Sequence, residues 1–173
     1  TGNIGKPSSG VNPLRGQNNV QGACDVGCLP NVYPGYQAVT SPEAKAKFES
    51  TWGVELSDKP GLTHTEIFDA CHGGSISALY LVGENPVLSE ANATHAIESM
   101  EKVDFMVVQD IFMTETAELA DVVLPAVTFA EKDGTFTNTE RRVQRVRKAI
   151  DPVGDAKPDW WITCQLSKRL DGK

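Results

Sequence analysis

A polar stretch near the amino terminus, residues 12–25, carries the side chains best suited to hold a ligand. It reads NPLRGQNNVQGACD and sets a lone arginine, Arg15, among amides and glycines. A guanidinium presents its N–H donors as a planar fork that matches a carboxylate or a phosphate. Amide side chains offer donors and acceptors that suit the edge of a heterocycle; here they are Gln17, Asn18, Asn19 and Gln21. The stretch is either a loose surface loop or a polar cradle around a ligand.

Polar residues also follow two predicted strands farther along the chain. Gly83-Glu84-Asn85-Pro86 follows the first strand, and Gln109-Asp110 follows the second. Ligands of open parallel α/β sheets bind outside the carboxyl ends of the strands, and a glycine there lets the backbone come close to them. Asn85 and Asp110 suit the ribose hydroxyls or the purine edge of a nucleotide. The alternative is that these are ordinary turn residues. The usual dinucleotide-binding motif is missing, since no G-x-G-x-x-G sequence follows a strand.

The other reactive side chains form no comparable pattern. The three histidines lie on predicted helices, and we interpret them as structural or solvated: His64, His72 and His95. Cys24 and Cys28 have no second cysteine pair and no nearby histidine, so the four cysteines are interpreted as reduced thiols. The basic run at residues 141–148 is either a solvated face or a contact with an anionic cofactor or partner subunit.

Two helices and a long irregular region should precede the turns. Residues 1–37 hold many Gly, Asn and Pro residues without a clear period, which predicts an extended, looped segment. Residues 41–52 predict a helix with Ser41 as N-cap and with Ala44, Phe48 and Trp52 on one face. A capping box of Thr63 and Glu66 begins a shorter helix, which Gly73-Gly74 ends.

Strands and helices then alternate. We expect strands at residues 76–82, 103–110 and 121–125, the second nearly all apolar from Phe105 to Val108. A helix at 89–102 and a short helix capped by Thr114 separate them. This order predicts an α/β fold, a three-layer open sheet that is mainly parallel and Rossmann-like. A helix that starts near Ser89 would also offer free N–H groups to a phosphate.

The carboxyl-terminal part should complete one domain over residues 1–173. Residues 134–150 predict a strand or hairpin, and residues 158–170 predict a helix with Ile162, Leu166 and Leu170 on one face. Within this single domain, residues 1–37 form the candidate active-site segment and residues 75–150 form the core sheet.

Composition limits the classes of function. The 173 residues are 40% hydrophobic, enough for one core, and the net charge of −7 argues against general binding to nucleic acid or to an anionic membrane. No apolar run approaches the length of a membrane span. The reduced thiols favour a cytoplasmic setting, with a periplasmic one left open.

Four blocks of the sequence resemble the molybdopterin oxidoreductase (DMSO reductase-like) family. Residues 1–37 resemble an internal segment of the catalytic subunit of formate dehydrogenases. The blocks LVGENP, VVQDIFMTETAELADVVLPA and EKDGTFTNTERRVQR follow in that family's order, so that the resemblance covers essentially the whole chain.

The resemblance implies a specific chemistry. Such subunits hold molybdenum or tungsten on two pyranopterin guanine dinucleotides and oxidise formate to CO2, and electrons leave through a 4Fe-4S cluster. Arg15 resembles the arginine that orients formate, and the pterin contacts are expected from Gly16, Gln17 and Asn18. The guanosine end is expected to contact Gly83, Glu84, Asn85, Ser89, Gln109 and Asp110. Asn85 and Ser89 replace the Asp and Thr of some relatives, which keeps hydrogen bonding but removes a carboxylate.

Several family motifs are absent from this sequence: the Cys-rich cluster motif, the Cys or selenocysteine metal ligand followed by His, and the carboxyl-terminal pterin domain. We therefore expect an internal segment of a larger subunit, inactive alone, that provides no metal ligand and depends on the rest of that subunit and on electron-transfer subunits. The alternative is a non-catalytic homologous domain in an iron–sulfur subunit such as that of respiratory complex I. Arg15 and its neighbours favour the first interpretation, because a domain without pterin has no use for them.

Overall fold

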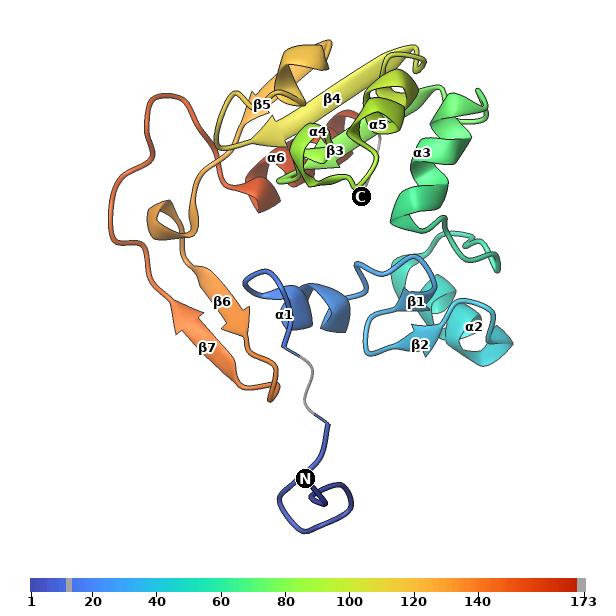
Figure 1. Ribbon diagram of the computed structural model, residues 1–173, viewed down its shortest axis with the longest axis vertical. Coiled ribbons are helices and arrows are strands. Elements are labelled where there is room, and N and C mark those ends of the chain that lie inside the picture. The colour runs from blue at the N-terminus through green and yellow to red at the C-terminus, as the bar shows by residue number, and fades with distance from the viewer. Residues whose placement is uncertain (12–13, 171–173) are drawn as a thin grey trace. The chain divides into compact units, whose positions relative to one another are not determined.

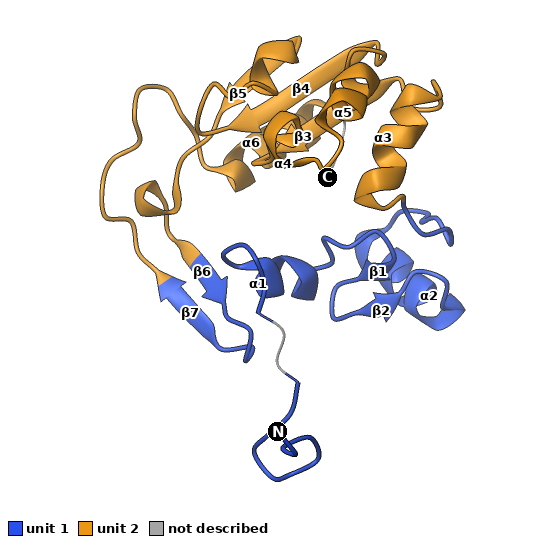
Figure 2. Ribbon diagram, viewed as in Figure 1, with its two compact units in different colours: residues 1–61, 135–145 blue, residues 62–134, 146–173 orange. Residues whose placement is uncertain are grey.

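The computed structural model describes residues 1–11 and 14–170. Asn12 and Pro13, which open the polar stretch, lie outside the described residues. The chain forms two compact units (Figure 2): unit 1 combines residues 1–61 with 135–145, and unit 2 combines residues 62–134 with the chain from 146 onward. The predicted single domain, with its segments 1–37 and 75–150, stays a prediction.

Unit 2 is built on a parallel sheet of three strands (Figure 1): β3 (Ala78–Val82), β4 (Phe105–Asp110) and β5 (Val122–Pro125). The strands lie in the order β3-β4-β5, and Val107 in the middle pairs with Tyr80 on one side and Val122 on the other. The predicted parallel α/β sheet is confirmed. Strand β4 begins two residues later than the expected 103–110, and Gln109 and Asp110 are its last residues instead of a turn that follows it.

Helices cover both faces of this sheet. On one face, α3 (His64–His72) and α5 (Ala93–Met100) supply Phe68, Ala96 and Met100 to a core completed by Met106 and Val108 of β4. On the other face, α6 (Asp159–Arg169) is joined to the sheet by a hydrogen bond from Gln109 to Asp159. The result is the expected three layers. The capping box that begins α3 is present, with Glu66 accepting the N–H of Thr63 at 2.7 Å.

The predicted helix at residues 89–102 is wrong in its first turn. Residues Pro86–Ser89 form a separate short helix, α4, and α5 begins only at Ala93. Asn92 is the better start, because its side chain accepts the N–H of His95 at 3.2 Å. Ser89 therefore ends a short helix, and the phosphate-binding helix start expected there is absent from the described structure.

Short 3-10 turns link the remaining elements of unit 2. Residues Ala117–Leu119 form η1, where Thr114 accepts the N–H of Ala117 at 3.1 Å as the predicted cap, and Phe129–Glu131 form η2. In α6, Ile162 is buried as expected, but Leu166 and Leu170 are exposed. Within the described residues, no helix is long and apolar enough to cross a membrane.

Unit 1 has more regular structure than its sequence suggests. The expected loop at residues 1–37 contains α1 (Val20–Asp25) and two short antiparallel strands, β1 (Val32–Tyr33) and β2 (Gln37–Ala38). The predicted helix at residues 41–52 is confirmed as α2 (Pro42–Trp52), capped by Ser41. In the small core of unit 1, the ring centroids of Tyr33 and Phe48 lie 4.8 Å apart.

The predicted hairpin is confirmed as β6 (Gly134–Thr137) and β7 (Val143–Val146), which form a two-stranded sheet. Its tip belongs to unit 1 and is closed by Asn138, whose side chain accepts the N–H of Arg142 at 2.9 Å. Arg141, in this turn, has a left-handed backbone with φ of 63°.

Candidate functional site

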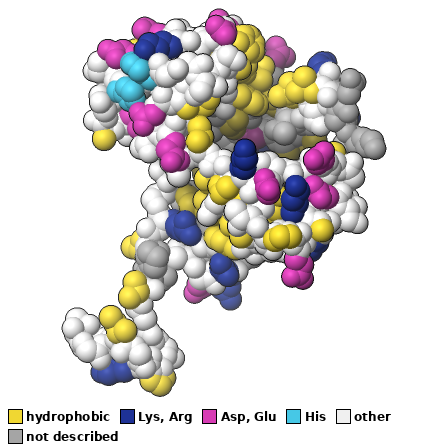
Figure 3. Space-filling view, turned by 90° about the vertical axis from the view of Figure 1, so that its right-hand side faces the viewer, with side chains coloured by type: hydrophobic (Ala, Val, Ile, Leu, Met, Phe, Trp, Pro, Cys, Tyr) yellow, Lys and Arg dark blue, Asp and Glu magenta, His cyan; other side chains and the backbone are white. Residues whose placement is uncertain are grey.

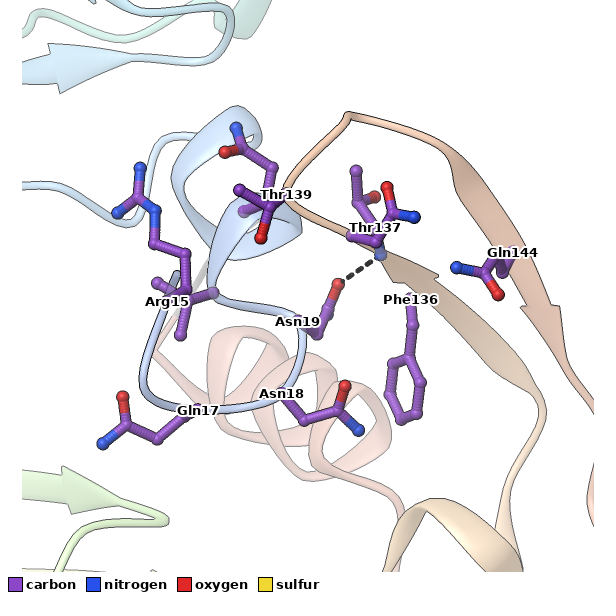
Figure 4. A pocket seen from close by; sticks show the side chains of 11 residues that line it. Arg15, Gln17, Asn18, Asn19, Phe136, Thr137, Thr139 and Gln144 are labelled. Carbon is purple, nitrogen blue, oxygen red and sulfur yellow. Dashed lines mark hydrogen bonds between the residues drawn. The ribbon is translucent and has the colours of Figure 1, made fainter. Parts of the chain in front are cut away.

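A cavity of about 300 Å³ in unit 1 brings the Arg15 loop together with the β6–β7 hairpin. The loop contributes Arg15, Gln17 and Asn18, and the hairpin contributes Phe136, Thr137, Asn138, Thr139 and Gln144. Figure 4 shows these side chains around one opening. Amides and hydroxyls dominate the lining, and they offer both donors and acceptors to a ligand. Arg15 and residues 17–21 of the polar stretch thus line a cavity, and a ligand held there stays a prediction.

Arg15 provides the positive charge of this cavity. Its guanidinium donates to the Sγ atom of Cys24 at 3.8 Å, and Cys24 itself is buried in α1. Among the described residues, no carboxylate lies within ion-pair distance of Arg15. The exposed guanidinium keeps most of its N–H donors for a ligand, and the preferred ligand group is a carboxylate or a phosphate.

Asn19 joins the two walls of the cavity. Its side-chain oxygen accepts the backbone N–H of Thr137 at 2.9 Å, across 118 positions of sequence. A second contact lies at the carboxyl-terminal end of α1, where the Arg141 guanidinium is 5.3 Å from the centre of the Tyr36 ring and 3.9 Å from the Asp25 carboxylate. Gln21 is buried and donates to Asp25 at 2.9 Å, so this amide supports α1.

The second group of candidate residues lies in unit 2, at the carboxyl ends of β3 and β4. Gly83 has a left-handed φ of 64°, and a Cβ atom built there would meet nothing within 4 Å. The backbone at Gly83 is therefore open to a ligand. Beside it, Ser89 donates to Glu84 at 2.7 Å on the exposed side of the turn.

Both polar atoms of the Asn85 side chain form hydrogen bonds within the protein. Its amide nitrogen donates to Glu115 at 2.9 Å, and its oxygen accepts the hydroxyl of Thr116 at 2.6 Å. The hydrogen bond from Asn85 lowers the pKa of the Glu115 carboxyl below its ordinary value. In this structure Asn85 connects the segments that follow β3 and β4, and its predicted contact with a nucleotide stays a prediction.

Gln109 is buried, with 1% of its surface exposed. Its amide oxygen accepts the hydroxyl of Tyr80, and its nitrogen donates to Asp159 at 2.8 Å. Burial acts to raise the pKa of Asp159, but hydrogen bonds from Lys132 and Gln109 hold it below its ordinary value. Asp110 accepts the N–H groups of Ile111 and Phe112 at 2.6 and 3.2 Å and shapes the turn after β4.

The comparison with known proteins assigns the family. Residues 1–169 match the sequence profile described as molybdopterin oxidoreductase. The chain belongs to the molybdopterin oxidoreductase family. It is 57% identical over 170 residues to the F420-dependent formate dehydrogenase subunit alpha of Methanocaldococcus jannaschii, which covers 98% of this chain and 25% of that protein. It is 55% identical to the putative formate dehydrogenase YrhE of Bacillus subtilis, over 98% of this chain and 17% of that protein.

This molybdopterin oxidoreductase chain therefore spans a quarter or less of the length of these relatives. Among solved structures, acetylene hydratase from Pelobacter acetylenicus matches with a TM-score of 0.57 and 28% identity, over 62% of this chain and 15% of the other. This likeness indicates a shared fold over the aligned part of the chain.

The described residues fit the cofactor that the family name implies, a molybdopterin carrying a metal. The cavity offers a cation and amides for phosphate groups and a heterocycle edge, and Gly83 leaves open backbone at a strand end. No group of three or more His, Cys, Asp or Glu side chains among the described residues could hold a metal ion. This molybdopterin oxidoreductase segment thus offers contacts to the organic part of the cofactor.

The histidines lie on helices α3 and α5 of unit 2, and of the thiols Cys24 accepts a hydrogen bond from Arg15. His64 pairs with Glu90 at 3.1 Å and His95 with Asp69 at 3.0 Å, and Figure 3 shows histidines beside acidic side chains on the surface. Cys24 and Cys71 are buried, whereas Cys28 and Cys164 are exposed.

Sequence reasoning missed the hairpin residues that complete the cavity. The basic run at residues 141–148 was considered from the sequence, while the useful signal was the hydroxyls and amides of the hairpin: Thr137, Asn138, Thr139 and Gln144. Of the basic run, Arg141 points to Tyr36 and Lys148 pairs with Asp151 at 2.6 Å. Local pattern could not reveal a partner 118 positions away.

Proposed function

We propose that this chain is an internal segment of a formate dehydrogenase catalytic subunit and that it places the arginine that binds formate. The observation that carries the proposal is Arg15, which lines an amide-rich cavity and has no carboxylate partner among residues 1–11 and 14–170. The identity of 55–57% to proteins named formate dehydrogenases supports the same substrate. A small carboxylate is the ligand that a free guanidinium binds through two parallel hydrogen bonds.

In this proposal the cofactor is a bis(molybdopterin guanine dinucleotide) with molybdenum or tungsten. When bound, it supplies the centre that takes up the two electrons released with one proton as formate becomes CO2. The Arg15 guanidinium orients the carboxylate through its N–H donors and takes no part in the proton transfer. Gly16, Gln17 and Asn18 contact the pterin.

The guanosine end of the cofactor is assigned to the strand ends of unit 2. Gly83 offers its open backbone, and Glu84 and Ser89 present side chains on the exposed side of the turn. Asp110 keeps one carboxylate oxygen beyond the turn that it caps. Asn85 and Gln109 support this surface from within through the contacts given above.

The remaining parts of the enzyme come from outside this chain. We propose that the rest of the catalytic subunit provides the metal ligand and a 4Fe-4S cluster and that separate subunits carry the electrons onward, because the relatives are named as alpha subunits. The segment alone is inactive. The proposed compartment is the cytoplasm, with the periplasm as the alternative.

Replacement of Arg15 in the full-length protein tests the proposal. Arg15→Ala should lower kcat/KM for formate by about 100-fold or more, since one preorganised charge contact is lost, while metal content measured by mass spectrometry stays constant. Arg169→Ala, a surface arginine of α6, is the matched control and should leave both values unchanged. Equal turnover by Arg15→Ala would refute the role in substrate binding, and loss of metal would make Arg15 a cofactor anchor.

A further inference from the structure

Asn19 has an unusual backbone for a residue with a side chain. Its φ of 59° places it in the left-handed region, directly before the first residue of α1. Asparagine tolerates this conformation better than most residues, though at a cost that glycine avoids. The side-chain oxygen lies over Gly22 in the first turn of α1 and accepts the N–H of Thr137 at 2.9 Å.

Gly22 shows that the space around this hydrogen bond is fully used. A Cβ atom at Gly22 would lie 2.3 Å from the Asn19 side-chain oxygen and 3.1 Å from its Cγ atom. The next neighbour, the Thr137 hydroxyl, is 3.2 Å away. A methyl group at position 22 would therefore push the Asn19 side chain off Thr137.

The loop between Arg15 and Asn19 has little else to hold it. Residues 14–19 contain no helix or strand, and Arg15, Gly16, Gln17 and Asn18 are all exposed. Beyond the long contact with Cys24 at 3.8 Å, no other side-chain hydrogen bond of Arg15 is formed within the described residues. Asn19 is the first residue after Arg15 that ties this loop to another element.

We propose that Asn19 is a positioning residue, which fixes the Arg15 loop against β6 so that the guanidinium and the hairpin form one site. The inference rests on the proposed function of Arg15 in binding formate. It adds a role for a residue that touches no reacting atom, and it assigns Gly22 as the residue that makes room for this contact. The second contact, from Arg141 to Tyr36 and Asp25, lies at the carboxyl-terminal end of α1 and involves no residue of the Arg15 loop.

The test is a double-mutant cycle in the full-length protein. Asn19→Gly removes the side chain and keeps the left-handed backbone free of strain. We expect Asn19→Gly and Gly22→Ala each to lower kcat/KM for formate about tenfold, mainly through KM, and the double variant to lose the same tenfold. Residues that act through one contact are not additive, so an additive loss of about 100-fold would overturn the proposal. Asn19→Asp keeps an acceptor and should restore most of the activity.

Amide hydrogen exchange provides a readout independent of turnover. In Asn19→Gly and in Gly22→Ala, the N–H of Thr137 should exchange at least tenfold faster than in the unchanged protein. Asn92→Gly is the matched control, because Asn92 also accepts a backbone N–H, at 3.2 Å, but in unit 2. It should leave Thr137 exchange and formate kinetics unchanged, and a fall in kcat/KM equal to that of Asn19→Gly would indicate a general loss of stability.

The two proposals fail in different ways. Unchanged exchange at Thr137 in Asn19→Gly would remove the positioning role, whatever Arg15 does. Faster exchange together with full activity of Arg15→Ala would leave the Asn19 contact standing and would refute the formate-binding role on which its function depends.

Discussion

The side-chain oxygen of Asn85 lies 2.6 Å from the hydroxyl of Thr116 and 3.3 Å from its backbone nitrogen. Thr116 is fully buried, and its hydroxyl also accepts the N–H of Val87 at 3.2 Å. Residues 31 positions apart thus hold together the segments that leave β3 and β4. This relationship explains how a turn that looks like a ligand loop keeps one shape.

Asn85→Ala should destabilise the chain by about 1–3 kcal/mol, because the buried hydroxyl of Thr116 and its N–H lose their acceptor. Urea denaturation followed by circular dichroism measures the change. Asn3→Ala, an exposed asparagine, serves as control and should change stability by less than about 0.5 kcal/mol. If both variants unfold at the same urea concentration, the hydrogen bonds of Asn85 do not contribute to the stability of the fold.

Glu131 predicts how stability depends on pH. Its carboxylate accepts the N–H of Thr128 at 2.7 Å and that of Val153 at 2.8 Å, and these bonds lower its pKa below the ordinary value of 4.5. A group whose pKa is lowered by folding contributes stability above its unfolded value and loses it as the pH falls through the folded value. The free energy of unfolding should therefore drop as the pH falls from about 5, and the drop should be smaller in Glu131→Gln.

The control for this prediction is Glu98→Gln on α5, which lacks such bonds among the described residues and should follow the unchanged chain. Unfolding is measured at fixed salt from pH 3 to 7. If the free energy of unfolding of Glu131→Gln falls with decreasing pH as steeply as that of the unchanged chain, the two hydrogen bonds do not favour the ionised carboxyl.

The elements of unit 2 were predictable because short-range signals specify them. The apolar run at Phe105 to Val108, the capping box at Thr63 and the order of strands and helices each follow from local sequence. The split between α4 and α5 was missed because Pro86 and Asn92 both start helices, and the apolar spacing continues through the break.

The candidate site was predictable in part, for a different reason. Arg15 and the neighbouring amide residues could be recognised as candidate ligand contacts from their residue types. The hairpin side of the cavity depends on a contact between Asn19 and Thr137, which no local sequence pattern predicts. The same limit applies to Gln109, whose polar type suggested a ligand contact. The sequence could not show that Tyr80 and Asp159, 29 and 50 positions away, would engage it.

Gln109→Ala should destabilise the chain by roughly 2–4 kcal/mol. The substitution leaves a small cavity and removes one partner each from Tyr80 and Asp159. Burial raises the pKa of Tyr80, so its hydroxyl stays a donor that needs an acceptor. Gln165→Ala on the surface of α6 is the control, and denaturation in urea gives both values.

Gln109→Glu sharpens this prediction, because it keeps the acceptor for Tyr80 but sets a second carboxylate beside Asp159. A carboxyl next to a like charge has a raised pKa in the folded state, so stability should be retained at low pH and lost as the pH rises through that value. Unfolding at pH 4 and pH 7 should therefore show a larger loss at pH 7. A variant at position 109 that binds guanine nucleotide less well while its stability is unchanged would make Gln109 a ligand contact and not a support of the sheet.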